Sequence, residues 1–263
     1  MAQTRSSQVW LQRLLPALSI LVFLAAWEAF VRIRQIQPIY LPAPSSIAHY
    51  LFEMIAGGSV FFHLGVTLLR ILAGFLVSAA VGVALGIVMG MSPVFARIMD
   101  PWIAALYPLP KIALIPLLII WLGTGEAYIL VISAVTAFFP VVMSTYAGIR
   151  EVDAGLIKAA QDLGANSRQV QLRVVLPAAI PSIFSGLHLG MGVVVILVVA
   201  AEMIGGSSQS GIGYLLINAG QVMETEKVFA CLILLALMGA VITKTQRWLD
   251  RKLAPWAAAM RRF

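Results

Sequence analysis

The sequence predicts an all-α membrane protein with about six transmembrane helices. Of its 263 residues, 61% are hydrophobic and only 11% are charged, whereas a soluble domain carries about 25% charged residues. The mean hydropathy is +0.96. Apolar runs also recur along the chain at about the 20-residue length that crosses a bilayer as a helix. There is too little polar surface to cover a globule in water, so the solvent of this chain is lipid.

Six apolar segments are expected to span the membrane. They lie at about residues 14–31, 67–91, 101–122, 127–147, 182–204 and 226–246. Residues 14–247 thus form one transmembrane domain between a short N-terminal tail, 1–13, and a basic tail, 248–263. The first run is long, ends in Arg32 and Arg34 and lacks a clear small-residue cleavage site. We therefore expect a retained helix and not a signal peptide.

Positive charge is distributed unevenly between the two sides of these spans. With the N-terminus inside, thirteen of the eighteen Lys and Arg residues fall on the inner side: Arg5, Arg13, Arg97, Arg150, Lys158, Arg168, Arg173, Lys244, Arg247, Arg251, Lys252, Arg261 and Arg262. The outer side keeps Arg32, Arg34, Arg70 and Lys227, and Lys111 lies within the membrane. Because Lys and Arg accumulate in cytoplasmic loops, both termini and the loop 150–181 are expected in the cytoplasm.

The formal net charge of +7 would suggest nucleic acid in a soluble protein, but here it is explained by cytoplasmic loop charge, and no nucleic-acid partner is expected. Cys231 is the single cysteine, so no disulfide within the chain is possible. The histidines, His49, His63 and His188, lie far apart, and no Cys/His metal pattern occurs. A P-loop is also absent from the sequence, so we expect no metal and no cofactor on this chain.

The segment between the first two spans is expected to lie on the outer surface. Residues 41–46, LPAPSS, form a loop that stops at a capping serine. A short amphipathic helix over 47–55 follows, and Gly57 and Gly58 end it.

The second span carries small residues at every fourth position. Such a stripe lets another helix backbone approach closely, which is a main source of packing energy in lipid. Arg70, at the outer end of the span, is expected to snorkel to the surface. The stripe consists of Gly74, Ser78, Gly82, Gly86 and Gly90.

The third span follows a short turn at 91–100 and is interrupted by Pro108, Pro110 and Pro116, so it cannot be a straight helix facing lipid. Broken backbone at membrane depth is tolerated only where protein or a water-filled cavity covers it. Lys111 in the same stretch also indicates a covered position, since an intramembrane charge usually faces a cavity or a partner. Equally, this part could lie at the cytoplasmic interface, and the sequence leaves both interpretations open.

Two further residues of the fifth span are candidates for a translocation pathway. His188 lies within the span, although a buried histidine is more often a packing residue. Glu202, near the outer end, is better placed and precedes the Gly- and Ser-rich segment 205–214, which could form a re-entrant or outer gate loop.

The loop 150–181 is the one long polar interruption, and it predicts two short helices. Asp153 can cap the first, and Gly164 ends it in a left-handed turn. Asn166 can cap the second, with Gln169 completing a capping box. Pro177 and Pro181 are expected to end that helix. A helix–turn–helix at the edge of a membrane protein is a docking surface suited to a groove.

The same residues resemble the EAA loop of permease subunits in binding-protein-dependent ATP-binding-cassette (ABC) importers. That loop reads E-A-A, three residues, G, nine residues, I-x-L-P. Here Lys replaces the Glu and Val the Ile, and the other motif positions map directly. By resemblance, the residues that couple to the ATPase are Lys158, Ala159, Ala160, Gly164, Val174, Leu176 and Pro177.

Residues 41–46, YPLPKIALIPLLIIWLGTGE and AEMIGGSSQSGIGYLL extend the resemblance to permeases of the nitrate, sulfonate, taurine and bicarbonate importer group. It implies a type I ABC importer (MetI-like) fold in the bacterial plasma membrane and a second, identical permease. Two cytoplasmic ABC ATPase subunits would bind ATP and Mg²⁺, so this chain is not itself an enzyme. A periplasmic or lipid-anchored solute-binding protein would deliver a small anion and largely choose the cargo.

Two other classes are weighed against this interpretation. A stand-alone secondary transporter or channel would show symmetric halves with paired broken helices and intramembrane carboxylates, whereas the sequence has one strongly broken span and one such carboxylate, Glu202. A membrane-embedded enzyme would need clustered catalytic groups, but the acids and histidines are scattered.

Overall fold

The computed structural model describes residues 3–205 and 209–256, and all regular secondary structure in these residues is helical. By length and composition, five of the described helices can cross a membrane, or six if one bent pair counts as a single span. The expected all-α membrane fold is therefore confirmed. The chain divides into two compact units, residues 1–61 with 215–234 and residues 62–214 with 235–263.

The first unit contains α1 (Gln3–Ile33), α2 (Pro44–Ala56), the second part of α10 (Ile212–Gln221) and the start of α11 (Thr225–Leu253). The predicted serine cap of α2 is wrong. Ala43 is the N-cap residue without a side-chain bond, and Pro44 occupies the first turn. Ser45 instead donates its backbone N–H (3.0 Å) and its Oγ (2.8 Å) to Glu28, which ties α2 to α1. Gly57 and Gly58 end α2 as expected, with Gly58 at φ +75°.

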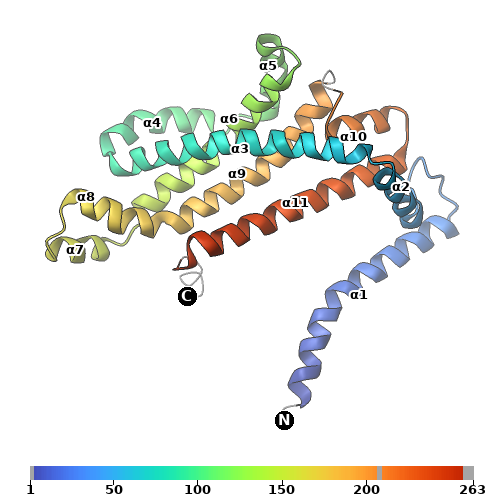
Figure 1. Cartoon of the computed structure of the whole chain (residues 1–263), viewed down its shortest axis with the longest axis horizontal. Helices are drawn as coiled ribbons and strands as arrows, with labels where there is room; N and C mark the ends of the chain where they lie inside the picture. Colours follow the sequence, from blue (N-terminus) through green and yellow to red (C-terminus); the bar gives the residue numbers. More distant parts are fainter. Residues whose placement is uncertain (1–2, 206–208, 257–263) are drawn as a thin grey trace. The chain divides into compact units, whose positions relative to one another are not determined.

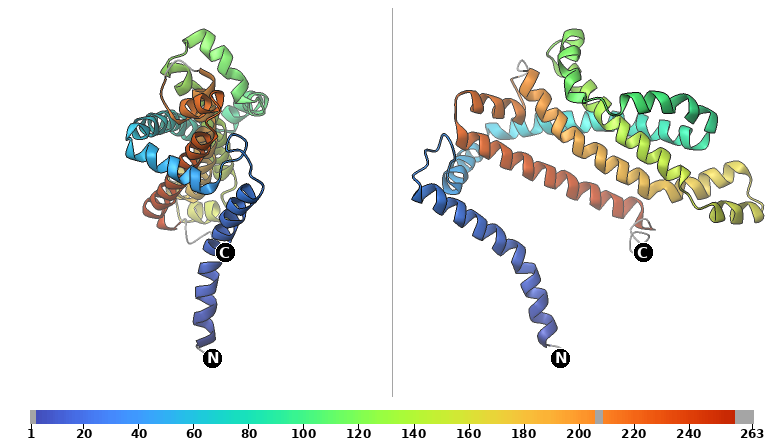
Figure 2. Two further views of the ribbon diagram at one scale, coloured as in Figure 1. Left: turned by 90° about the vertical axis from the view of Figure 1, so that its right-hand side faces the viewer. Right: turned by 180° about the vertical axis from the view of Figure 1, so that it is seen from behind.

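The second unit is built on α6 (Glu126–Arg150), which packs between α3 (Ser59–Met91) and α9 (Leu176–Gly205). Figures 1 and 2 show α6 and α9 running side by side. On α9, a Cβ at Gly186 would lie 2.5 Å from Ser144 Cβ, and one at Gly190 would lie 3.1 Å from Val141 Cγ2. Glycines therefore set the close approach of α9 to α6.

The small-residue stripe of α3 faces α6, so the predicted close contact with another helix is confirmed. A Cβ at Gly82 would lie 2.9 Å from Val141 Cγ1, and one at Gly86 would lie 2.6 Å from Thr145 Cβ. One turn beyond, a Cβ at Gly90 would meet Ile149 at 2.6 Å. The residue numbers of the contacting pairs rise together along both helices, so α3 and α6 run parallel. The pairing stays in register over four turns.

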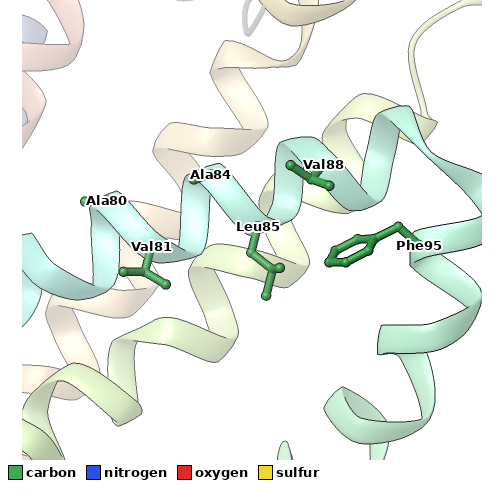
Figure 3. A pocket seen from close by; sticks show the side chains of 6 residues that line it. All are labelled: Ala80, Val81, Ala84, Leu85, Val88 and Phe95. Atoms are coloured by element: carbon green, nitrogen blue, oxygen red, sulfur yellow. The ribbon is translucent and has the colours of Figure 1, made fainter.

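Another face of α3 remains apolar and open. Together with Phe95 of α4 (Pro93–Leu106), it lines a shallow groove of about 500 Å³, shown in Figure 3. The groove residues on α3 are Ala80, Val81, Ala84, Leu85 and Val88. An apolar surface of this kind is what a helix in lipid presents to its surroundings.

The segment before the third span corrects one prediction. Residues 91–100 were expected to be a turn, but α4 begins at Pro93, and Ser92 Oγ accepts the Phe95 N–H at 3.3 Å as its N-cap. Serine at the cap and proline in the first turn are a helix start, and Pro101 is accommodated inside the helix.

The predicted break in the third span is confirmed. After α4 ends at Leu106, the chain bends by 84° into the 3₁₀ turn η1 (Lys111–Leu114) and α5 (Ile115–Leu122). Pro108 and Pro110 lie in the connection, and Pro116 lies in the first turn of α5. These prolines occupy positions where a missing N–H costs little.

Candidate functional site

The loop between α6 and α9 has the two short helices that its sequence predicts: α7 (Ala154–Asp162) and α8 (Ser167–Val170). Asp153 Oδ1 accepts the Gly155 N–H at 2.5 Å and caps α7. Asn166 and Gln169 form a reciprocal capping box, each side-chain oxygen accepting the other's backbone N–H at 2.9 Å.

The turn between α7 and α8 is a Schellman motif. Gly164 has φ +86°, and its N–H donates to Gln161 O at 2.8 Å, while the Ala165 N–H donates to Ala160 O at 3.0 Å. Only glycine adopts this backbone without strain. Gly164 and Ala160, both positions of the EAA-type pattern, therefore shape the turn itself.

The sequence predicts that the second loop helix ends at Pro177 and Pro181, and this prediction is wrong. Instead α8 passes through a π turn, η2 (Gln171–Val175), directly into α9, which contains Pro181. A proline clashes with the carbonyl four residues before it, and for Pro177 that residue is Arg173, inside the π turn. The wider π geometry accommodates such a clash without ending the helix.

One face of the loop is anchored to the helix bundle. Val170 and Val175 are buried against Ile149 of α6 and Ala179 of α9, and Ala160 packs at the edge of the same cluster. Figure 1 shows α7 and α8 at one end of the α6–α9 pair. The loop is thus packed against both α6 and α9.

The opposite face of the loop is exposed and partly apolar. Leu163 is 89% exposed at the tip of the turn, with Leu156 (54%) and Leu172 (49%) on the flanking helices. Of the predicted coupling residues, Lys158, Ala159 and Gly164 are also exposed, whereas Ala160, Val174, Leu176 and Pro177 are half-buried. The predicted set therefore divides into an exposed face and a face that packs against the bundle.

A buried charge cluster joins three helices elsewhere in the same unit. Arg70 of α3 is 3% exposed, and its Nη1 lies 2.8 Å from Glu202 Oε1 of α9. Its Nε donates to Glu126 Oε2 of α6 at 2.7 Å, and Nη1 also donates to the Ser210 carbonyl at 2.9 Å. Glu202 is further bound by Thr67 Oγ1 at 3.0 Å.

This cluster corrects the expectation that Arg70 snorkels. Its guanidinium has two carboxylates within reach and is satisfied inside the bundle, which is cheaper than leaving Glu202 unpaired in an apolar interior. The segment after α9 also binds the Glu202 carboxylate, since the Gly213 N–H donates to Glu202 Oε2 at 2.9 Å. Gly211 (φ +103°) lies so close to the Glu202 carboxylate that a side chain there would collide with it. Residues 206–208 of the predicted gate loop lie outside the described residues.

The sequence contained a signal for this cluster. Arg70 and Glu202 are opposite charges inside two predicted spans, and such charges usually pair with each other. Glu126, Thr67 and Ser210 could not have been found, because nothing in their sequence surroundings marks them as partners.

Lys111 lies in a groove of about 400 Å³ at the bend of the third span. Its Nζ donates to the carbonyl oxygens of Leu106 (3.3 Å) and Tyr107 and lies 4.6 Å from the centroid of the Phe139 ring. The ammonium group thus caps the C-terminal end of α4, where positive charge is favourable. Leu189 of α9 also lines the groove.

His188 points elsewhere, with Nε2 3.0 Å from Asp250 Oδ2 of α11. The predicted pathway residues are therefore not brought into one site. Lys111, Pro108 and Pro110 share the bend, Pro116 starts α5, His188 contacts α11, and Glu202 is enclosed in the charge cluster. Their role in a pathway stays a prediction.

The fold and the loop together define a multi-pass, all-helical membrane protein with a capped two-helix projection, a class that includes transporter permeases. The family model of the binding-protein-dependent transport system inner membrane component matches residues 82–255. The chain belongs to this family, and it is a transmembrane permease subunit of an ABC importer.

Relatives match along almost the whole chain. A putative aliphatic sulfonates transport permease protein, SsuC of Bacillus subtilis (strain 168), is 37% identical over 92% of this chain and 86% of its own. The taurine transport system permease protein TauC of Escherichia coli (strain K12) is 35% identical over 90% and 88%. An inward-facing structure of the MetNI methionine ABC transporter matches with a TM-score of 0.59 at 20% identity, covering 71% of this chain and 92% of its own. The last comparison shows the shared type I importer fold.

Proposed function

We propose that two copies of this chain form the translocation pathway of an importer in the bacterial plasma membrane. Two cytoplasmic ABC ATPase subunits, which themselves bind and hydrolyse ATP with Mg²⁺, bind the loop 150–181. A periplasmic or lipid-anchored binding protein delivers the solute. The permease chain itself supplies no catalytic group.

The observation that carries the coupling role is the exposure of Leu163 on a rigid, capped turn. Burying a leucine side chain gains about 1.5–3 kcal/mol, so a leucine that is 89% exposed at the tip of a projection favours a partner with an apolar groove. Lys158 of α7, Arg168 of α8 and Arg173 of η2 are also exposed and favour an acidic rim on that groove.

The coupling role is tested by co-purification of the ATPase with Leu163→Glu. A charge in the middle of an apolar contact is expected to weaken the complex by at least about 2 kcal/mol, or some thirtyfold. Leu253→Glu is the matched control, because Leu253 is 62% exposed at the end of α11 and is not part of the loop. Undiminished recovery of the ATPase with Leu163→Glu would contradict the proposal.

The proposed cargo is a small anion of the sulfonate, taurine, nitrate, bicarbonate or organic-acid type. The support comes from the relatives named for aliphatic sulfonates and taurine, which match over at least 90% of this chain. In proteoliposomes with the ATPase and the binding protein, we expect ATP-dependent uptake of labelled taurine or an alkanesulfonate. Uptake without the ATPase would instead favour the alternative, a stand-alone secondary transporter or channel.

A further inference from the structure

The last three turns of α11 carry three basic side chains on one face. Lys244, Arg247 and Arg251 follow one another at three- and four-residue spacing, and all are exposed. Like charges at these spacings repel each other along a helix. In the described part of the chain none of the three forms an ion pair.

The nearby acid does not relieve this repulsion. Asp250 is the sole acidic residue in the segment 243–253, and it turns away to contact His188 of α9 at 3.0 Å. The three cations thus form a concentrated positive surface that an external anion would stabilise.

The same face continues into an apolar trough toward the centre of the helix. Gly239, Ala240 and Thr243 carry small side chains, and with the basic residues and Trp248 they line a groove of about 570 Å³. Trp248 is 57% exposed, and an exposed Trp beside basic residues at the end of a span is typical of the membrane interface.

We propose that this surface binds an anionic phospholipid of the cytoplasmic leaflet. The phosphate group lies among Lys244, Arg247 and Arg251, and the upper part of an acyl chain lies over Gly239 and Ala240. Charge complementarity selects the headgroup, and the trough distinguishes a lipid from a free anion. Basic residues that served only to orient the chain would not need to share one face or adjoin such a trough.

The test is native mass spectrometry of the full-length chain in detergent, titrated with phosphatidylglycerol or with phosphatidylcholine of the same acyl chains. We expect preferential retention of phosphatidylglycerol. Arg247→Gln should lower that retention about fivefold, the usual effect of one basic residue near an anionic surface, and neutralising all three residues should abolish the preference.

Arg97→Gln is the matched control. Arg97 is exposed in α4 and lines no part of this groove. This variant removes the same charge and should retain the lipid. Equal retention of the two lipids by the unaltered chain would overturn the proposal without any variant. An equal loss with Arg97→Gln, or displacement of the lipid by millimolar inorganic phosphate, would also overturn it. Because the readout involves no transport, failure here leaves the proposed cargo untouched.

Discussion

Replacing Arg70 with methionine tests whether the buried charge cluster holds the ends of α3, α6 and α9 together. The side chain of Arg70 is 3% exposed and that of Glu202 is fully enclosed. Methionine fills a similar volume but leaves the Glu202 carboxylate with hydroxyl and amide donors alone. Removing one partner of a buried pair costs about 3–5 kcal/mol.

The same cluster supplies its own control. Glu126 also pairs with Arg70, but its side chain is 57% exposed. Glu126→Gln should therefore cost at most about 1 kcal/mol, as exposed ion pairs do. Arg70→Met removes the partner of both carboxylates, whereas Glu126→Gln removes only the exposed pair, so the difference between the two variants reports mainly the buried pair with Glu202.

The assay heats the purified chain in nanodiscs and measures the fraction that remains folded by size-exclusion chromatography. With about 2–4 °C per kcal/mol for a chain of this size, Arg70→Met should lower the midpoint by about 6–20 °C and Glu126→Gln by less than about 4 °C. Equal shifts for the two variants would refute the argument that burial of Glu202 makes this cluster structural.

Three further outcomes are expected. Gly86→Ala should destabilise the chain by about 1–3 kcal/mol, because its Cβ would lie 2.6 Å from Thr145 Cβ; Gly192→Ala, which meets nothing within 4 Å, should be neutral or stabilising in the same melting assay. Asn166→Ala should cost about 1 kcal/mol of local stability by removing the capping box, which faster amide hydrogen exchange in α8 would reveal, and unchanged exchange would contradict it. Lys111→Glu should reduce anion uptake far more than expression if Lys111 lines the pathway, and unchanged uptake would favour its role as a cap of α4.

The parts of the fold that the sequence predicts well depend on local or periodic patterns. Apolar length is enough to place the helices, since lipid leaves the backbone few alternatives. The four-residue spacing of small residues on α3 predicted a close helix contact, and α6 provides it. The caps at Asp153 and Asn166 were also predictable, because a cap bonds to backbone only two or three residues away.

The parts that could not be predicted depend on contacts between distant residues. Opposite charges within two spans indicate that Arg70 and Glu202 can pair, but Glu126, Thr67 and Ser210 are brought to this pair only by the fold. Pro177 reads as a helix stop because the π turn that accommodates it has no clear sequence signature. The pattern around Ala160 identified the coupling loop, but only the structure shows that Ala160 faces the bundle and Leu163 faces outward. A substitution at Leu163 therefore tests docking more cleanly than one at Ala160 or Gly164.

The central claim is that the tip of the α7–α8 turn meets an ATPase inside the cell. Leu163→Cys in a Cys231→Ala background places the single thiol of the chain at this 89% exposed position. A short thiol cross-linker applied to membranes of cells that express the whole transporter should join this cysteine to the ATPase subunit, and a membrane-impermeant maleimide should label it only after the membrane is opened. Labelling of intact cells from outside, or no cross-link to any ATPase, would contradict the account.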